Sequence, residues 1–292
     1  MKYRRSIGEV VFDLFNMFFM ICLILVTLYP FYYILIASFS DPTLLIKARG
    51  FFTVPLGFST SAYDAVISNP LIRIGYLNTL FYVVGGTTLG LLLTSFGAYA
   101  LSRRKYLGRD FFMIVIVITM FFSGGLIPTF LLVKSLGLLD TRFAVFIPTA
   151  INTWNLIIMR TAFRQVPFSL EESAKMDGAN DFTILFRIFL PVSLPVVAVM
   201  ILFYSVHYWN EFFYAMIYLR TRTLYPLQLF LREIIIASSA QSMMTGVVSD
   251  RAPIGQTIKY ATIILTTLPI LVVYPFLQRY FVRGVMIGAI KE

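Results

Sequence analysis

Two groups of polar side chains interrupt long apolar stretches of this 292-residue sequence, and their residue types are suited to binding by hydrogen bonds. The groups consist of Asn152, Trp154 and Asn155, and of His207, Tyr208, Trp209, Asn210 and Glu211. Asn152 and Asn155 are three residues apart, and His207 and Glu211 are four apart, so each pair would share one face of a helix. Polar groups inside apolar helices are costly, and they often line a solute pathway. The alternative is that they hydrogen-bond between helices, with Glu211 pairing with His207 or facing water.

Covalent chemistry is poorly supported by the same residue types. A membrane-embedded enzyme would need a cluster of His, Asp and Glu or an activated nucleophile, and the chain has one His and few carboxylates in its apolar stretches. The single cysteine, Cys22, excludes an internal disulfide and a multi-cysteine metal site. We therefore expect no catalytic residue and no metal site.

The composition is that of an integral membrane protein. The chain is 59% hydrophobic and 13% charged, with a mean hydropathy of +0.82, whereas soluble domains have about a quarter charged residues. Helices are expected, because an open strand edge in lipid would leave backbone groups unsatisfied. The sequence predicts one all-α membrane domain over residues 1–292. Its six spans lie near residues 11–39, 79–101, 111–133, 143–163, 192–218 and 260–278.

The distribution of Lys and Arg predicts that both termini are cytoplasmic. With the N-terminus inside, 14 of the 24 basic residues fall on the inner side. The run Arg103-Arg104-Lys105 weighs most, because it lies in a short loop, and short loops report topology best. The net charge of +10 fits anchoring beside anionic lipid. It does not indicate nucleic-acid binding, which would want a contiguous basic face with interleaved aromatic residues.

The inner loop at residues 164–191 is polar and carries helix signals. Ser169 and Glu172 have the spacing of a capping box, in which each side chain satisfies an orphan backbone N–H. Gly178 can end this helix in the left-handed conformation, and Asn180 or Asp181 can cap a second helix. The first helix is too short to be stable alone, so it needs a docking surface. The alternative is an amphipathic helix that lies on the membrane.

The spacing of this loop resembles the cytoplasmic signature of permease subunits of bacterial ABC importers, E-A-A-x3-G-x9-I-x-L-P. The chain matches it at Glu172, Ala174, Gly178, Ile188, Leu190 and Pro191, with Ser173 replacing the first alanine. Asp177-Gly178-Ala179, Trp209-Asn210-Glu211 and the tail from Gln278 to Gly284 are similar to the carbohydrate-uptake branch, in particular to the smaller maltose permease subunit. The resemblance runs from about residue 8 to the C-terminus.

The resemblance implies a type I permease fold with six membrane helices, located in the bacterial inner membrane. The short helix would fit a cleft of a cytoplasmic ATPase, where Glu172 would pair with a basic group. The coupling residues would be Glu171, Glu172, Ser173, Ala174, Asp177, Gly178, Ala179 and Arg187. The chain has no G-x-x-x-x-G-K-[ST] phosphate loop, so it would bind no cofactor itself, and ATP and Mg would sit on two partner ATPase copies.

The same resemblance implies a second, different permease subunit and an extracytoplasmic solute-binding protein as further partners. The cargo would be a sugar, because sugars bind to flat aromatic faces and amide or carboxylate groups such as those in the two polar groups. Oligosaccharide importers are the nearest in appearance, and some carry anionic uronate chains such as alginate fragments. Permeases for amino acids, peptides or phosphate share the cytoplasmic signature and remain alternatives. So does a stand-alone secondary transporter, which would need ion-coupling carboxylates that are nearly absent apart from Glu211.

Overall fold

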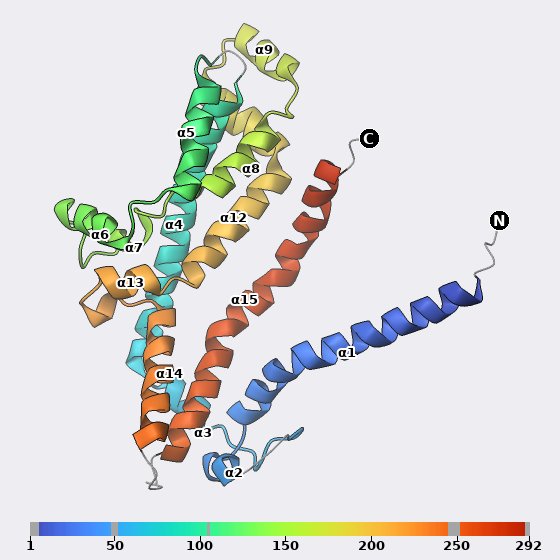
Figure 1. Ribbon diagram of the computed structural model, residues 1–292. Coiled ribbons are helices and arrows are strands. Elements are labelled where there is room, and N and C mark those ends of the chain that lie inside the picture. Colours follow the sequence, from blue (N-terminus) through green and yellow to red (C-terminus); the bar gives the residue numbers. More distant parts are fainter. Residues whose placement is uncertain (1–5, 48–51, 104–105, 245–251, 290–292) are drawn as a thin grey trace. The chain divides into compact units, whose positions relative to one another are not determined.

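A computed structural model describes residues 6–47, 52–103, 106–244 and 252–289 of the chain. The described residues form helices, apart from loops and one isolated antiparallel bridge between Ser40 and Phe58. Two compact units are present, one within residues 1–69 and 233–267 and the other within residues 70–232 and 268–292. The boundaries between the units pass through α14 (Leu227–Met244) and α15 (Ala252–Ala289), which are labelled in Figure 1.

The first unit is built around α1 (Ile7–Ser38), which a capping box between Ser6 and Glu9 starts. The buried residues of α1 are the last three, Ile36, Ala37 and Ser38, so most of this apolar helix is left to face lipid or other chains. Two short helices follow, α2 (Pro42–Lys47) and α3 (Ser61–Ile67). Tyr63 of α3 bonds to Ser38 with 2.7 Å between the hydroxyl oxygens, which closes this segment against the end of α1.

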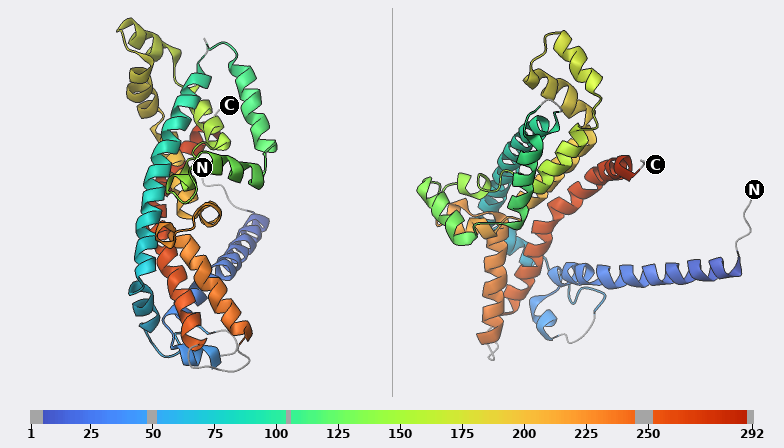
Figure 2. Two further views of the ribbon diagram at one scale, coloured as in Figure 1. Left: turned by 90° about the vertical axis from the view of Figure 1, so that its left-hand side faces the viewer. Right: turned by 45° about the horizontal axis from the view of Figure 1, so that its top comes forward.

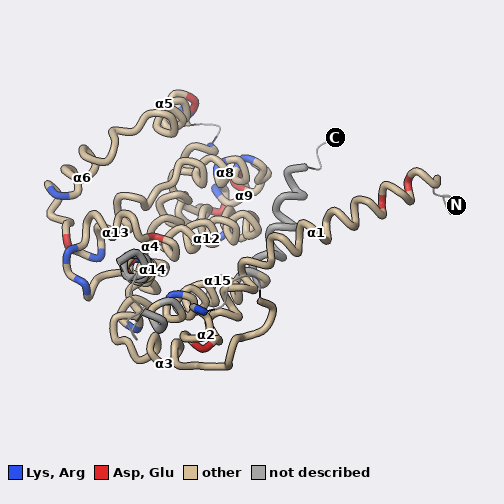
Figure 3. The backbone as a smooth tube through the Cα atoms, turned by 60° about the horizontal axis from the view of Figure 1, so that its bottom comes forward, with Lys and Arg blue, Asp and Glu red and all other residues tan. Residues whose placement is uncertain are grey.

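The second unit is a helical bundle. Its members are α4 (Pro70–Ser102), α5 (Arg109–Phe121), α6 (Leu126–Ser135), α7 (Phe143–Phe146), α8 (Thr153–Phe163), α9 (Phe168–Met176), α10 (Asp181–Ile184), the π-helical segment η1 (Leu185–Phe189), α11 (Leu190–Val192), α12 (Leu194–Trp209), α13 (Phe213–Tyr218) and the 3-10 turn η2 (Arg222–Leu224). Helices α4, α8 and α12 pack against one another, and Figure 2 shows the elements from two further directions. Figure 3 shows no charged residue along α12.

Small residues on α4 let α12 approach closely. A Cβ atom added to Gly86 would lie 2.5 Å from the ring of Tyr208, and one added to Gly90 would lie 2.9 Å from the ring of Tyr204. Two glycines four residues apart form the small-residue stripe that membrane helices use for close packing. Thr94 adds a bond across the same seam, with 2.6 Å between its hydroxyl oxygen and that of Tyr204.

Three of the six expected spans are not continuous helices. The stretch 111–133 breaks at residues 122–125 and turns by 113° between α5 and α6. The stretch 143–163 contains only α7 and α8, separated by residues 147–152, and 192–218 breaks at residues 210–212 between α12 and α13. Local sequence explains the breaks: Gly125 has φ +84°, Pro148 lies in the second gap, and Glu211 caps the helix that follows the third.

The remaining expected spans lie within longer helices. Residues 11–39 coincide closely with α1, residues 79–101 lie inside α4, and residues 260–278 lie inside α15. Among the described residues, α1 and α4 are long and apolar enough to cross a bilayer by themselves. The number rises to four if α5 with α6, and the helical stretch Asp181–Val192 with α12, each count as one bent span. The second of these pairs turns by 90° at Ser193.

Candidate functional site

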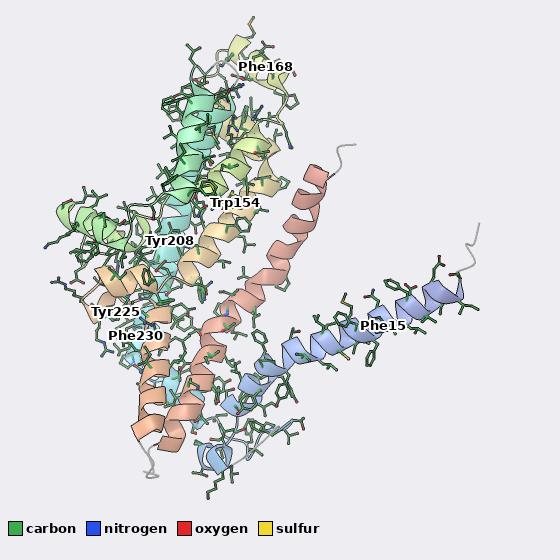
Figure 4. The ribbon with its side chains drawn as sticks, viewed as in Figure 1. Phe15, Trp154, Phe168, Tyr208, Tyr225 and Phe230 are labelled. Atoms are coloured by element: carbon green, nitrogen blue, oxygen red, sulfur yellow. The ribbon has the colours of Figure 1, made fainter. Side chains whose placement is uncertain are left out.

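The helix α9 lies at one end of the second unit, where Phe168 is labelled in Figure 4. It begins two residues before the expected start, because Pro167, and not Ser169, takes the cap position, with extended backbone and no side-chain cap bond. Ser169 therefore lies inside the first turn and is exposed. The expected capping box between Ser169 and Glu172 is absent from this helix, and that prediction is wrong.

The end of α9 follows the expectation for Gly178. This glycine has φ +81°, and its N–H donates to the carbonyl of Lys175 at 3.1 Å. The N–H of Ala179 donates to the carbonyl of Ala174 at 2.9 Å, so the two bonds form a Schellman motif. Asn180 then caps α10, since its side chain accepts from the N–H of Thr183 at 2.8 Å. The left-handed turn and the second cap are both confirmed.

The two sides of α9 differ sharply in exposure. Its outward residues include Glu172 and Ser173, and Met176 is 88% exposed. Asp177, Gly178 and Arg187 are exposed as well. On the inward side, Ala174 and Ala179 pack against the buried core formed by α4, α8, η1 and α12. An exposed methionine at the tip of a polar loop is an adaptable contact for a partner.

Glu171 belongs to the inward side, although the sequence grouped it with the residues that contact a partner. It is 4% exposed. Its carboxylate forms an ion pair with the guanidinium of Arg103, the residue just after α4, and it lies 2.8 Å from the Lys175 ammonium one turn along. Arg103 also lies over the rings of Tyr99 and Phe189, 5.0 and 4.9 Å from their centroids. Glu171 thus ties α9 back to α4 and η1.

The electrostatics of this contact are dominated by burial. Burial lowers the pKa of the Arg103 guanidinium, and the charges of Tyr99 and Asp181 oppose that shift. The guanidinium remains protonated throughout the range in which proteins are stable. Arg103 is thus a fixed cation at the base of α9.

In the first group of candidate pathway residues, one side chain is buried and two are exposed. Asn152 is the cap of α8, and its side chain accepts from the N–H of Asn155 at 3.1 Å, so the two are not neighbours on one helix face as expected. Asn155 is buried, whereas Trp154 is 59% exposed. Figure 4 labels Trp154 near the start of α8, well away from α9. Asn152 and Trp154 therefore remain accessible, and Asn155 does not.

The second group likewise contains both buried and exposed side chains. Tyr208 is fully buried, and its hydroxyl donates to the carbonyls of Phe146 and Thr149 at 3.4 and 3.3 Å. Trp209 is buried with its ring against Tyr76. Two members are exposed, His207 and Asn210, and the Asn210 side chain donates to the carbonyl of Val206 at 2.9 Å.

Glu211 has a structural partner that the sequence did not suggest. It is buried, and its carboxylate accepts from the N–H of Tyr214 at 2.7 Å, which caps α13. Capping explains a carboxylate in an apolar stretch, because the first N–H groups of a helix have no partner within the helix. The expected choice between pairing with His207 and facing water thus omitted a third role.

A third cluster was missed altogether. Asp140 has φ +58°, and its carboxylate accepts from the N–H groups of Arg220 and Thr221, both at 2.8 Å, and from the Thr221 hydroxyl at 2.6 Å. These bonds, with the Thr221 hydroxyl foremost, lower the pKa of Asp140. Asn78 donates to the carbonyls of Thr223 and Tyr225 at 2.7 and 3.1 Å. Together they fix the loop between α13 and α14, and only an acidic residue in a turn hinted at this.

The arrangement is suited to mechanical coupling. Within the described ranges, no group of three or more His, Cys, Asp or Glu side chains lies close enough to hold a metal ion. The features that stand out are a short polar helix with one exposed face, an internal ion pair on its other face and closely packed apolar helices beyond that pair. Such a set can transmit displacement from a docked partner to the bundle.

Comparison with known proteins shows the family to which the chain belongs. Residues 86–287 match the family described as "Binding-protein-dependent transport system inner membrane component". The chain is 44% identical over 281 residues to the polygalacturonan/rhamnogalacturonan transport system permease protein YtcP of Bacillus subtilis, covering 96% of this chain and 98% of the relative. It is 43% identical to protein LplC of the same organism, covering 96% and 95%.

A solved structure gives the same result in three dimensions. It is that of a bacterial ABC transporter involved in the import of the acidic polysaccharide alginate, and one of its chains superposes with a TM-score of 0.86 at 36% identity. The match covers 95% of this chain and 99% of the other. The chain therefore belongs to the family of binding-protein-dependent transport system inner membrane components.

Proposed function

We propose that this chain forms half of the translocation pathway of an ATP-driven importer whose cargo is an acidic, uronate-containing oligosaccharide. The second half is a different permease subunit, and two copies of a cytoplasmic ATPase hold ATP and Mg. A solute-binding protein delivers the cargo on the outer side. Both termini and α9 are cytoplasmic, which agrees with the basic run at Arg103 in the same inner region.

The observation that carries the coupling role is the two-sided structure of α9. Its exposed face, with Glu172, Ser173 and Met176, is free for an ATPase cleft, while its other face is held to α4 by Glu171. A nine-residue helix is marginal by itself and is stabilised by tertiary contacts. ATP-driven closure of the ATPase dimer would displace α9 and so switch the bundle between inward and outward access.

The choice of cargo rests on the relatives. The 44% identical YtcP is a permease for polygalacturonan and rhamnogalacturonan, and the 36% identical structure belongs to an alginate importer. The lactose permease LacG of Rhizobium radiobacter, whose cargo is a neutral sugar, is 28% identical. The exposed side chains Asn152, Trp154, His207 and Asn210 are the ones that would meet the sugar.

The test is ATP hydrolysis by the complete complex in lipid, with and without loaded binding protein. We expect Glu172→Ala to abolish most of the stimulation, because it removes the charged group from the docking face. Asp64→Ala is the matched control, since Asp64 is an exposed acidic residue on α3. Unchanged stimulation in Glu172→Ala, with normal assembly, would refute the coupling role.

Cargo is tested in the same preparation by loading the binding protein with different sugars. Oligogalacturonates should stimulate hydrolysis and accumulate inside proteoliposomes, and neutral malto-oligosaccharides should do neither. Stimulation by the neutral sugar alone would refute the uronate proposal and leave the result for Glu172 intact.

A further inference from the structure

The buried ion pair behind α9 has a role distinct from partner docking. We propose that Glu171 and Arg103 are positioning residues that transmit the displacement of α9 to α4, and so set how much cargo moves per ATP hydrolysed. The proposal rests on the function proposed for α9 but concerns a different face of that helix. The docking face can bind the ATPase whether or not its movement reaches the bundle.

Arg103 is the meeting point of three elements. It follows the last residue of α4, its guanidinium contacts the carboxylate of Glu171 on α9, and it lies over the ring of Phe189 in η1. Its side chain is 16% exposed and that of Glu171 is 5% exposed, so water competes little for the pair. A displacement of Glu171 must therefore move Arg103 or leave the buried Arg103 guanidinium without this carboxylate partner, while Lys175 stays beside Glu171 on the same helix.

A second set of polar contacts connects α9 to α10, and α10 to α4. The Lys175 ammonium lies 2.8 Å from Glu171 and 3.8 Å from Asp181, the first residue of α10. The Tyr99 hydroxyl of α4 donates to the same Asp181 carboxylate at 3.0 Å. Polar contacts thus run from α4 to α9, on to α10 and back to α4, and they bound a cavity of about 390 Å³.

The covalent connections of α9 are less suited to this task. Residues 164–167 precede it, and the turn at Gly178 follows it. Neither connection joins α9 to α4, whose end is held to α8 and α12. Arg160 of α8 donates from Nε to the carbonyl of Leu101 at 3.0 Å, and α4 is seated on α12 through Gly86 and Gly90. Movement that arrives at Arg103 is therefore carried directly into the bundle.

The experiment compares Glu171→Gln with Glu172→Gln, the same substitution at a buried and at an exposed position, one residue apart on α9. The complete complex, reconstituted in proteoliposomes with loaded binding protein, is assayed for both ATP hydrolysis and sugar import. We expect Glu171→Gln to assemble and to keep stimulated hydrolysis, while sugar imported per ATP falls roughly 2- to 30-fold, the range of mutations that disturb coupling. Glu172→Gln should instead lower stimulated hydrolysis, with import falling in proportion.

Two further variants separate transmission from folding of the loop. Arg103→Lys keeps the charge but loses the planar fork, so its import per ATP should lie between that of the wild type and that of Arg103→Gln. The double variant Glu171→Gln with Arg103→Gln should be no worse than the poorer single variant, because both act through one contact. Additive losses in the double variant would overturn the proposal.

The two proposals fail in different ways. A wild-type ratio of import to hydrolysis in Glu171→Gln overturns the positioning role. Loss of stimulated hydrolysis in Glu171→Gln, equal to that in Glu172→Gln, also overturns it, because Glu171 would then act in docking. Unaltered stimulated hydrolysis in Glu172→Gln refutes only the docking role of the exposed face. The ratio of import to hydrolysis in Glu171→Gln then still tests the positioning role.

Discussion

The close contact between α4 and α12 makes a quantitative prediction for Gly86. Gly86→Ala would place a Cβ atom 2.5, 2.6 and 2.7 Å from three ring atoms of Tyr208, where ordinary van der Waals contact begins near 3.4 Å. The ring cannot easily swing away, because Tyr208 is fully buried and its hydroxyl is bonded to Phe146 and Thr149. The helices must therefore separate or strain.

The neighbouring glycine is a matched control for this substitution. A Cβ atom at Gly85 would have its nearest neighbour at 3.7 Å, on the ring of Phe146. Both variants gain the same helix propensity, about 0.8–1 kcal/mol for Ala over Gly. The difference between Gly86→Ala and Gly85→Ala is therefore the overpacking cost alone, about 1–3 kcal/mol.

Thermal unfolding of the purified complex in detergent measures this difference. At about 2–4 °C per kcal/mol, Gly86→Ala should melt roughly 2–12 °C below Gly85→Ala. Adding Tyr208→Leu to Gly86→Ala should recover part of the loss, because the ring atoms that clash are gone. Equal melting temperatures for the two alanine variants would refute the inferred contact between the helices.

Two further predictions concern backbone geometry and acid sensitivity. At Gly178 nothing lies within 4 Å of an added Cβ atom, so Gly178→Ala should cost only the strain of the left-handed conformation, about 1–2 kcal/mol. Gly178→Asn should cost less. Amide hydrogen exchange of residues 168–176 measures both costs, and equal protection in the two variants would contradict the prediction. The pKa of Asp140 is lowered in the folded protein. The stability that its ionised carboxylate contributes is therefore fully present above the unfolded-state pKa of about 3.9, and it is lost as the pH falls through the folded-state pKa. Asp140→Asn should lower amide protection at Arg220 and Thr221 at neutral pH, with the gap from wild type closing below about pH 4; a gap that is independent of pH would count against the bonds to Asp140.

The features that the sequence could predict are those fixed by neighbouring residues. Gly178 at a helix end and Asn180 as a cap depend on two or three adjacent positions, and both are confirmed. The capping box at Ser169 failed because Pro167, with its fixed backbone, started the helix two residues earlier. Local rules thus identified the turn correctly but not the position of the helix start.

The features that the sequence could not predict depend on residues far apart in the chain. Arg103 was interpreted only as a topology signal, and nothing local shows that it meets Glu171. The bonds from Asp140 to Thr221 join residues 81 positions apart. Hydropathy likewise could not separate a continuous span from two helices joined at an angle, as at α5 and α6, because both are equally apolar.

The burial of Tyr208 limits how this importer can be redirected to a new sugar. A side chain that seats one helix on another cannot be exchanged freely, since each change alters the spacing of α4 and α12. The side chains of Trp154 and His207 are exposed, so they are not confined by helix packing in this way. Directed evolution of cargo preference should therefore accumulate substitutions at the exposed positions and leave Tyr208 unchanged.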